Sequence, residues 1–288
     1  MLTLIINPTA GSGYARKVAP QLQEELNKRG IAHEMVYTQY PGHATELART
    51  AARKPHCEAV LAVGGDGTAY EVACGLVNTG KALGMIPAGT GNDFIKTTRT
   101  PAKPLAALDF ILSHAPRPVD IGRLHDRMFL NVCGTGFDVT VLDYAQAAKR
   151  YVRGLLPYLV GLIRAIFHYR PVRLHLVADE QTIQQELLVC SIANGRYIGG
   201  GIPICPVADP GDGWLDLVTV DNVPRRIIPR YLPALLLGHI LQIPAARHLR
   251  CKSVTLDAPQ MRINVDGEIL TMDHAEFSVL PGKLLLYW

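Results

Sequence analysis

Short-range cysteine motifs are absent from this sequence of 288 residues. No two of its six cysteines stand at the spacing of a zinc site or a thioredoxin-like redox pair, and its ten histidines show no metal-ligand spacing. We therefore interpret the thiols as scattered and mostly buried. The N-terminus lacks the basic segment and the apolar run of a signal peptide. These two absences predict a reducing, cytoplasmic location.

The sequence also has no large excess of charge. Lysine and arginine total 29 against 25 for aspartate and glutamate, which gives a formal net charge of +4. This mild basicity suits an anionic surface without requiring a nucleic-acid partner, and we expect none. Hydrophobic residues make up 48% of the chain, which excludes a disordered protein. At roughly 150 residues per domain, the length predicts two domains.

Strand-like and helix-like segments alternate in the first third of the chain. Apolar runs that predict strands cover residues 2–6, 33–37, 59–63 and 83–86. Helical periodicity appears between them, as in Val18, Leu22 and Leu26 at a spacing of four. Repeated units of this kind predict an α/β domain with a parallel sheet covered by helices.

The pattern changes after about Asp120, where short strand-like runs separated by turns predict a mostly antiparallel β-sandwich domain. The predicted strands cover residues 129–132, 172–177, 187–192, 215–220, 254–256, 261–265 and 283–287. Pro116 and Pro118 break regular structure near the joint. We place the two domains at residues 1–121 and 122–288.

Two apolar stretches, residues 154–169 and 227–243, interrupt the β-rich half. Each is short and contains arginine and proline, so neither predicts a transmembrane span. A buried or capping helix is one interpretation, and a lipid-facing helix at a membrane surface is the other. Flanking cations favour docking to an anionic leaflet. They are Lys149, Arg150, Arg153, Arg170 and Arg173 around the first stretch, and Arg225, Arg226, Arg247 and Arg250 around the second.

Three loops rich in small residues follow predicted strands, at residues 7–13 (NPTAGSG), 64–68 (GGDGT) and 87–94 (PAGTGNDF). Adjacent parallel strands end at the same edge of a sheet, and open α/β sheets bind ligands at that edge. Glycine lets the backbone approach a phosphate, and the helix that follows offers unpaired N–H groups. Asp66 adds a carboxylate for a phosphate-bound Mg²⁺. The chain lacks the GxxxxGK[ST] and GxGxxG fingerprints, so a nucleotide site here is of another type.

In this order the three motifs resemble the diacylglycerol kinase catalytic-domain family, which includes bacterial diacylglycerol and lipid kinases, sphingosine kinases and ceramide kinases. The GGDGT motif alone would also suit NAD kinases. The resemblance continues to the end of the chain and covers nearly all of it. Its later matches are residues 131–138, 199–201, 206–208, 212–216 and 265–268.

The resemblance implies ATP bound between two domains, with its phosphates over GGDGT. Asp66 and Asp120 would organise a catalytic Mg²⁺, and Glu268 would be the general base for a lipid hydroxyl. Without the resemblance, residues 265–268 predict a plain hairpin, because Asp-Gly favours a type I′ turn. The residues implied around the nucleotide are Asn7, Pro8, Thr9, Ala10, Gly11, Thr38, Gly64, Gly65, Asp66, Gly67, Thr68, Ala69, Tyr70 and Thr90.

A second metal is implied at residues 209–214, because the equivalent turn of bacterial members binds a structural Mg²⁺. The ligands would be the Asp212 side chain and the backbone carbonyls of Asp209 and Trp214. Such an oxygen-only set suits a hard cation. A glycine-rich turn without metal is the alternative interpretation.

The favoured function is ATP- and Mg²⁺-dependent phosphorylation of a lipid hydroxyl by a cytoplasmic protein peripheral to the membrane. Diacylglycerol is the favoured acceptor and phosphatidic acid the product. An NAD kinase is one alternative, although the Asn-Glu pair that such enzymes use on the NAD ribose is not found. A non-catalytic lipid-binding protein on the same scaffold is another, although Asp66, Asp120 and Glu268 are intact. The sequence leaves the acceptor lipid open and allows a homodimer.

Overall fold

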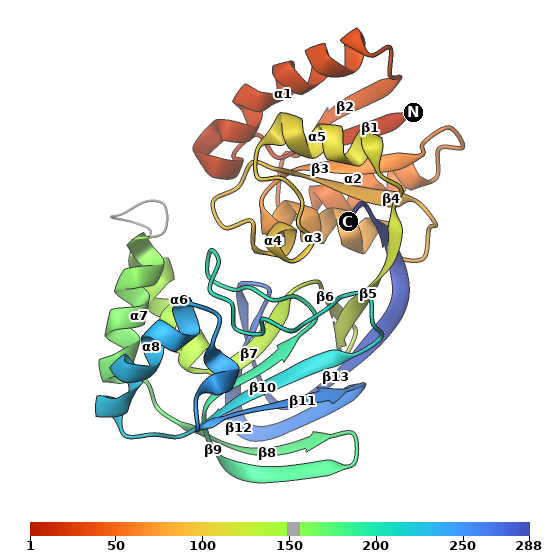
Figure 1. Cartoon of the computed structure of the whole chain (residues 1–288). Coiled ribbons are helices and arrows are strands. Elements are labelled where there is room, and N and C mark those ends of the chain that lie inside the picture. Colours follow the sequence, from red (N-terminus) through yellow and green to blue (C-terminus); the bar gives the residue numbers. More distant parts are fainter. Residues whose placement is uncertain (149–155) are drawn as a thin grey trace. The chain divides into compact units, whose positions relative to one another are not determined.

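The computed structural model (Figure 1) describes residues 1–148 and 156–288, in two units. The first unit comprises Met1–Val119 with Gly282–Trp288, and the second comprises Asp120–Pro281. The predicted boundary after residue 121 places Gly282–Trp288 in the second domain. It belongs to the first unit because the end of strand β13 (Glu268–Leu286) pairs in parallel with β4 (Ala82–Pro87).

A parallel sheet forms the centre of the first unit. Its strands have the order β4-β3-β1-β2, with β1 at Leu2–Ile6, β2 at His33–Tyr37 and β3 at Ala59–Gly64. Every residue of β1, β3 and β4 is buried, which explains their uninterrupted apolar sequences. These strands confirm the predicted parallel sheet.

Helices cover both faces of this sheet (Figure 1). The helices α1 (Ala10–Lys28) and α5 (Pro104–Ser113) share a core with one face of β1, β3 and β4. The helices α2 (His43–Ala52) and α3 (Asp66–Leu76) pack against each other on the opposite face. A short helix, α4 (Asp93–Thr97), follows β4. The first unit is therefore the predicted α/β domain.

The second unit is built from antiparallel strands in the order β11-β10-β9-β7-β12-β13. The long strands β9 and β12 each pair with β7 near one end and with β8 near the other. This confirms a mostly antiparallel β domain. Its elements are β5 (Arg117–Leu124), β6 (Arg127–Phe129), β7 (Val132–Gly136), α6 (Phe137–Ala148), α7 (Leu156–His168), β8 (Val172–Ala178), β9 (Gln181–Ala193), β10 (Leu215–Asp221), α8 (Ile228–Leu236), β11 (Ala246–Cys251) and β12 (Ser253–Val265).

Alternation along the strands gives the second unit two cores. Leu215 and Leu217 of β10 lie in one core between strands, while Val218 and Val220 lie in a second core beneath α7 and α8. One polar contact alters a predicted strand. The predicted strand at residues 129–132 is interrupted, because the Asp266 carboxylate accepts hydrogen bonds from the N–H groups of Leu130, Asn131 and Val132, at 2.7, 3.0 and 3.1 Å.

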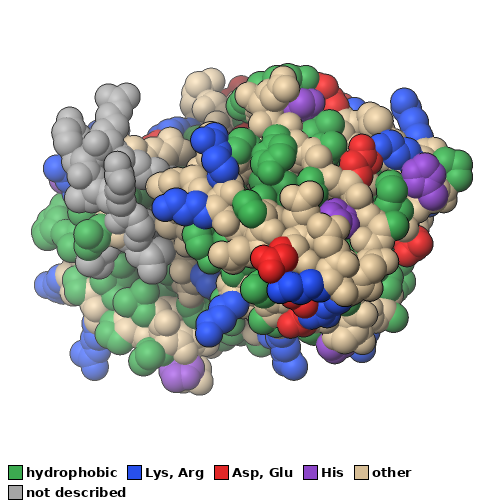
Figure 2. Space-filling view, turned by 90° about the horizontal axis from the view of Figure 1, so that it is seen from above, with side chains coloured by type: hydrophobic (Ala, Val, Ile, Leu, Met, Phe, Trp, Pro, Cys, Tyr) green, Lys and Arg blue, Asp and Glu red, His purple; other side chains and the backbone are tan. Residues whose placement is uncertain are grey.

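The two apolar stretches form α7 and α8 with short 3₁₀ turns around α8, and no helix in residues 1–148 or 156–288 is long and apolar enough to cross a membrane. Each helix buries one side and exposes large hydrophobic side chains on the other. Phe167 of α7 is 65% exposed, and Leu237, directly after α8, is 71% exposed. Hydrophobic side chains (green) gather on the left of Figure 2, with lysine and arginine side chains (blue) beside them. The helices α7 and α8 lie on the left of Figure 1. Lys149, Arg150 and Arg153, three of the predicted docking cations, lie outside the described residues.

Candidate functional site

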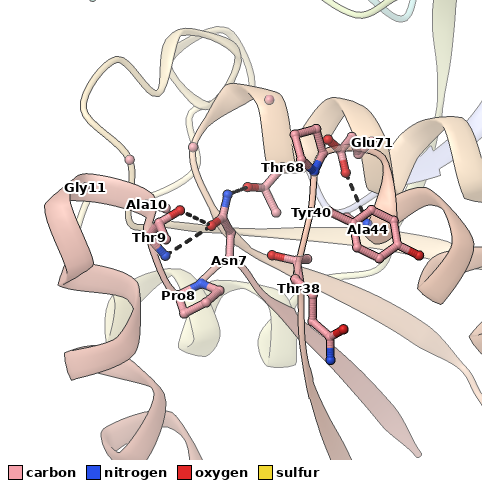
Figure 3. A pocket seen from close by; sticks show the side chains of 15 residues that line it. Asn7, Pro8, Thr9, Ala10, Gly11, Thr38, Tyr40, Ala44, Thr68 and Glu71 are labelled. Carbon is pink, nitrogen blue, oxygen red and sulfur yellow. Dashed lines mark hydrogen bonds between the residues drawn. The ribbon is translucent and has the colours of Figure 1, made fainter. Parts of the chain in front are cut away.

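A pocket of about 390 Å³ opens at the carboxyl edge of the parallel sheet in the first unit (Figure 3). The small-residue loops after β1, β3 and β4 all contribute to it, as the sequence predicts. This volume falls within the range of small-molecule sites, roughly 300–1,000 Å³. Its lining residues are Asn7, Pro8, Thr9, Ala10, Gly11, Thr38, Gln39, Tyr40, Pro41, Ala44, Gly65, Gly67, Thr68, Glu71 and Gly89.

Asn7 ties the first loop to the first turn of α3 (Figure 3). Its side-chain oxygen accepts hydrogen bonds from the N–H of Thr9 at 3.2 Å and from the Thr9 hydroxyl at 2.8 Å. Its side-chain amide donates to the Thr68 hydroxyl at 3.2 Å. One asparagine therefore holds two walls of the pocket in register.

Gly11 brings the first loop against the loop after β4. Gly11, Ser12 and Gly13 all have positive φ, at 58°, 56° and 89°, so regular α-helix begins only after them. An ideal Cβ on Gly11 would lie 2.3 Å from the Ala88 carbonyl oxygen. The glycine in the NPxxGxG motif is thus required both by its backbone conformation and by this close approach.

The N-terminus of α3 borders the pocket without a side-chain cap. Its N-cap residue, Gly65, lines the cavity, as do Gly67 and Thr68 of the first turn. The N–H groups at a helix start have no partner within the helix and mark the positive end of its dipole. This end of α3 therefore suits an anion such as a phosphate.

Glu71 is a pocket residue that the sequence analysis missed. Its carboxylate accepts hydrogen bonds from the N–H groups of Gly42 and Ala44 at 2.9 and 3.1 Å, at the start of α2 (Figure 3). Thr68 and Glu71 fit the local pattern of a capping box, but Glu71 caps the neighbouring helix instead. Only the tertiary contact shows that it fixes the loop at residues 38–44.

Tyr40, also missed, stands at the mouth of the pocket in that loop. Its hydroxyl donates to Glu46 at 2.8 Å, and its ring stacks on His43 with centroids 4.5 Å apart. An ordered aromatic ring at the edge of a cavity can pack against a flat group such as a nucleobase. No sequence motif marked this residue.

Five predicted nucleotide residues do not line this pocket. Gly64, Asp66 and Ala69 line a smaller hollow behind the GGDGT turn with Asn92 and Ile95. Tyr70 and Thr90 are absent from the lining of the larger pocket. The predicted residues are divided between the two cavities because the GGDGT turn faces the larger pocket with Gly65, Gly67 and Thr68, whereas Asp66 lines the smaller hollow.

Asp66 holds the start of α4. Its carboxylate accepts a hydrogen bond from the Phe94 N–H at 3.1 Å. Burial raises the pKa of the Asp66 carboxyl, and the neighbouring Asp93 carboxylate raises it further. The Asp93 carboxylate also pairs with the Lys96 ammonium group at 3.2 Å. Lys96 therefore supplies a positive charge beside these two carboxylates.

Asp120 belongs to the second unit and is bonded to the turn at residues 209–214. Its carboxylate accepts the Gly213 N–H at 2.6 Å, and its own N–H donates to the Pro210 carbonyl at 2.6 Å. The carboxylate of Asp212 in that turn accepts the Trp214 N–H at 3.0 Å with one oxygen and pairs with Arg250 through the other. Arg250 therefore places a positive charge beside Asp212, and the structural Mg²⁺ at this turn stays a prediction.

Glu268 follows a tight hairpin turn and is 66% exposed. Asp266 and Gly267 have positive φ of 46° and 98°, as the Asp-Gly sequence predicts for a type I′ turn. The Glu268 carboxylate forms an ion pair with Arg127. An exposed carboxylate on a rigid turn can accept a proton from an incoming hydroxyl once this pair opens.

Family comparisons agree with this architecture. Residues 1–124 match the diacylglycerol kinase catalytic domain, and residues 131–288 match the YegS C-terminal NAD kinase beta sandwich-like domain. A diacylglycerol kinase of Mycobacterium tuberculosis (strain ATCC 25618 / H37Rv) is 31% identical over 290 residues, covering 98% of this chain and 93% of that protein. A diacylglycerol kinase of Bacillus subtilis (strain 168) is 28% identical over 279 residues, covering 95% and 91%.

Solved structures share the fold over the whole chain. A crystal structure of a diacylglycerol kinase from Bacillus anthracis str. Sterne has a TM-score of 0.76 at 23% identity, covering 100% of this chain and 96% of that one. A second crystal structure from that organism has a TM-score of 0.84 at 24% identity, covering 100% and 97%.

Proposed function

The chain belongs to the diacylglycerol kinase catalytic-domain family, and from this premise we propose that it transfers the γ-phosphate of ATP to a lipid hydroxyl. We propose diacylglycerol as the acceptor and phosphatidic acid as the product. The observation that carries the proposal is the convergence of three glycine-containing loops and the uncapped start of α3 on one pocket.

The pocket fits the phosphates of a nucleotide. Gly65, Gly67 and Gly89 expose backbone rather than side chain to the cavity, which lets a phosphate approach N–H groups closely. The Asp66 carboxylate lies in the turn after β3, next to this pocket, and we propose it as a ligand of a hard cation. When bound, ATP and Mg²⁺ supply the phosphoryl group and the positive charge that offsets its negative charge during transfer.

Glu268 is proposed as the general base for the lipid hydroxyl. Its exposure leaves it accessible to a substrate, and its place after a hairpin turn limits its movement. Glu268 would take the proton of the attacking hydroxyl as the new oxygen–phosphorus bond forms, and ADP would leave with the electron pair of the broken bond to the γ-phosphorus. Such a base contributes roughly 10²- to 10⁴-fold in rate.

The exposed surface of α7 and α8 supports a lipid acceptor rather than NAD. Phe167 of α7 and Leu237, directly after α8, are large exposed hydrophobic residues. Arg164 and Arg230 lie exposed on the same two helices. An apolar face with arginine at its margin docks at an anionic bilayer, where a lipid hydroxyl is presented. A soluble acceptor such as NAD needs no such face.

The test is transfer of labelled γ-phosphate to a panel of lipid alcohols in anionic vesicles, with NAD as a soluble acceptor. We expect diacylglycerol to be labelled by the native protein and by Glu276→Gln, which removes an exposed carboxylate elsewhere on β13. Glu268→Gln should lose at least about 100-fold of the activity. Labelling of NAD alone would replace the proposal with an NAD kinase. Vesicle binding without labelling would indicate a non-catalytic lipid-binding protein.

A further inference from the structure

Three side chains with metal-ligating atoms meet in the second unit, far from one another in sequence. The Cys205 sulfur, a carboxylate oxygen of Asp216 and an imidazole nitrogen of His248 all lie within 4.8 Å of one another. Cys205 and Asp216 are 0% and 2% exposed, and His248 is half-buried. The residues come from the loop before β10, from β10 and from β11. The sequence spacing of cysteines and histidines could not indicate such a group.

The strand register explains how two of the three ligands meet. Strands β10 and β11 are antiparallel, with Asp216 opposite Arg250 and Val218 opposite His248. Asp216 and Val218 therefore point to the same face as His248, because side chains alternate along a strand. The imidazole Nε2 of His248 lies 2.6 Å from Oδ1 of Asp216.

The loop before β10 brings the third ligand over this face. Cys205 and Ala208 pack in the same core as Val218. The Ala208 N–H donates a hydrogen bond to the Cys205 carbonyl oxygen at 3.2 Å, which closes this part of the loop into a turn. The turn lies against the same core as Val218, on the face of β10 that also carries Asp216.

We propose that Cys205, Asp216 and His248 bind a zinc ion, with water in a fourth position. One thiolate, one imidazole and one carboxylate form a donor set that suits Zn²⁺ in tetrahedral geometry, whereas Mg²⁺ prefers oxygen ligands alone. The thiolate is the form of cysteine that ligates metals. Zinc binding therefore displaces the thiol proton to solvent as the sulfur–zinc bond forms.

The site would fix a loop that is also bonded to Asp120. The same loop continues through Pro210 and Gly213. The Pro210 carbonyl accepts a hydrogen bond from the Asp120 N–H at 2.6 Å, and the Gly213 N–H donates one to the Asp120 carboxylate, also at 2.6 Å. A zinc ion that fastens Cys205 to β10 and β11 therefore stabilises the backbone around Asp120. The site differs from the predicted Mg²⁺ turn in its ligands, and it does not depend on the proposed kinase activity.

The experiment measures metal in the whole purified protein. Zinc content is determined by mass spectrometry after dialysis, and Co²⁺ is then substituted for zinc and followed by absorption spectroscopy. We expect one metal per chain and a thiolate-to-cobalt charge-transfer band. The matched control is Cys251→Ser, because Cys251 is a buried cysteine of β11 that lies in the other core.

Two variants decide the assignment. Cys205→Ser should abolish the charge-transfer band, while Cys251→Ser should retain it. His248→Gln alters a half-buried side chain, so it tests the site even where Cys205→Ser fails to fold; it should lower zinc affinity by more than the roughly 10- to 100-fold seen for outer-shell changes. The proposal is overturned if the native protein binds no stoichiometric metal, or if His248→Gln binds zinc with unchanged affinity.

Discussion

The backbone of Gly65 lies directly against the backbone of Gly89. An ideal Cβ on Gly89 would lie 2.3 Å from the Cα of Gly65, and one on Gly65 would lie 3.1 Å from the Cα of Gly89. Strands β3 and β4 run in parallel up to Gly64 and Pro87, so the loops that follow them begin side by side. The pocket wall here is two chain segments in backbone contact with no side chain between them, so a ligand can approach the backbone directly.

Gly89→Ala should separate these loops. An added methyl group has no room, and overpacking of this kind costs about 1–3 kcal/mol of unfolding free energy. We also expect a higher KM for ATP, because the N–H groups of the two loops move apart. Chemical denaturation and ATP-dependent kinetics measure the two effects. Gly67→Ala is the control for stability, since an ideal Cβ there meets nothing within 4 Å; equal stabilities of the two variants would contradict the prediction.

Glu71→Ala should loosen the loop at residues 38–44. It leaves the N–H groups of Gly42 and Ala44 without their acceptor, which costs about 1–3 kcal/mol. The KM for ATP should rise, whereas Glu71→Gln should retain part of the affinity through its remaining oxygen. Glu24→Ala, on the exposed surface of α1, is the control. An unchanged KM in Glu71→Ala would show that the loop does not contribute to binding.

Asp266 and Glu268 should differ sharply, although one residue separates them. Asp266→Ala removes the acceptor of three backbone N–H groups and should cost about 2–4 kcal/mol of stability. Glu268→Gln breaks an exposed ion pair with Arg127, worth about 1 kcal/mol or less, yet it should abolish most lipid phosphorylation. Denaturation and the kinase assay together separate the two roles. Full turnover by Glu268→Gln would exclude it as the base.

The sequence predicts strands best where burial is continuous. The strands at residues 2–6 and 59–63 are predicted correctly, because both of their faces are covered and every residue in them is buried. The strand β13 was recognised only at its end, because burial along it is irregular and polar residues interrupt the apolar pattern. Its return to the first unit depends on pairing with β4, which no local pattern encodes.

The glycine motifs predict the location of the candidate site but not the directions of its side chains. Glycine loops after strands indicate a cavity, since strand ends of a parallel sheet share an edge. Side-chain directions were not predictable, and Asp66 points to α4 while Glu71 caps α2. The group of Cys205, Asp216 and His248 lay beyond sequence reasoning because strand register and a covering loop assemble it.

Charged substitutions on the exposed face of α7 and α8 should weaken vesicle binding. Phe167→Glu and Leu237→Glu each remove apolar surface and add a charge that anionic lipids repel. Losses of about 1–2 kcal/mol correspond to roughly 5- to 30-fold weaker binding. Vesicle sedimentation measures this, with Tyr14→Glu on exposed α1 as the control. Equal binding by all three variants would locate the docking surface elsewhere.

Asp138 should make stability depend on pH. It is buried in α6, one of its oxygens has no hydrogen-bond partner, and burial raises its pKa from 3.8 to about 6. As pH rises from 4 to 6, the unfolded chain loses this proton before the native protein does, so stability falls. This pKa difference contributes roughly 3 kcal/mol to the unfolding free energy at pH 4 and below, and the contribution is lost above the native pKa.

Asp138→Asn removes this titration and should therefore gain stability relative to the native chain as the pH rises. Urea denaturation between pH 4 and pH 8 measures the difference in unfolding free energy, which should widen through the window from 4 to 6 and then stay constant. Asp126→Asn, which changes an exposed carboxyl between β5 and β6, should show no such widening. A constant difference between native protein and Asp138→Asn would mean that the carboxyl ionises in the native state as readily as in the unfolded chain, and that its burial is relieved by water.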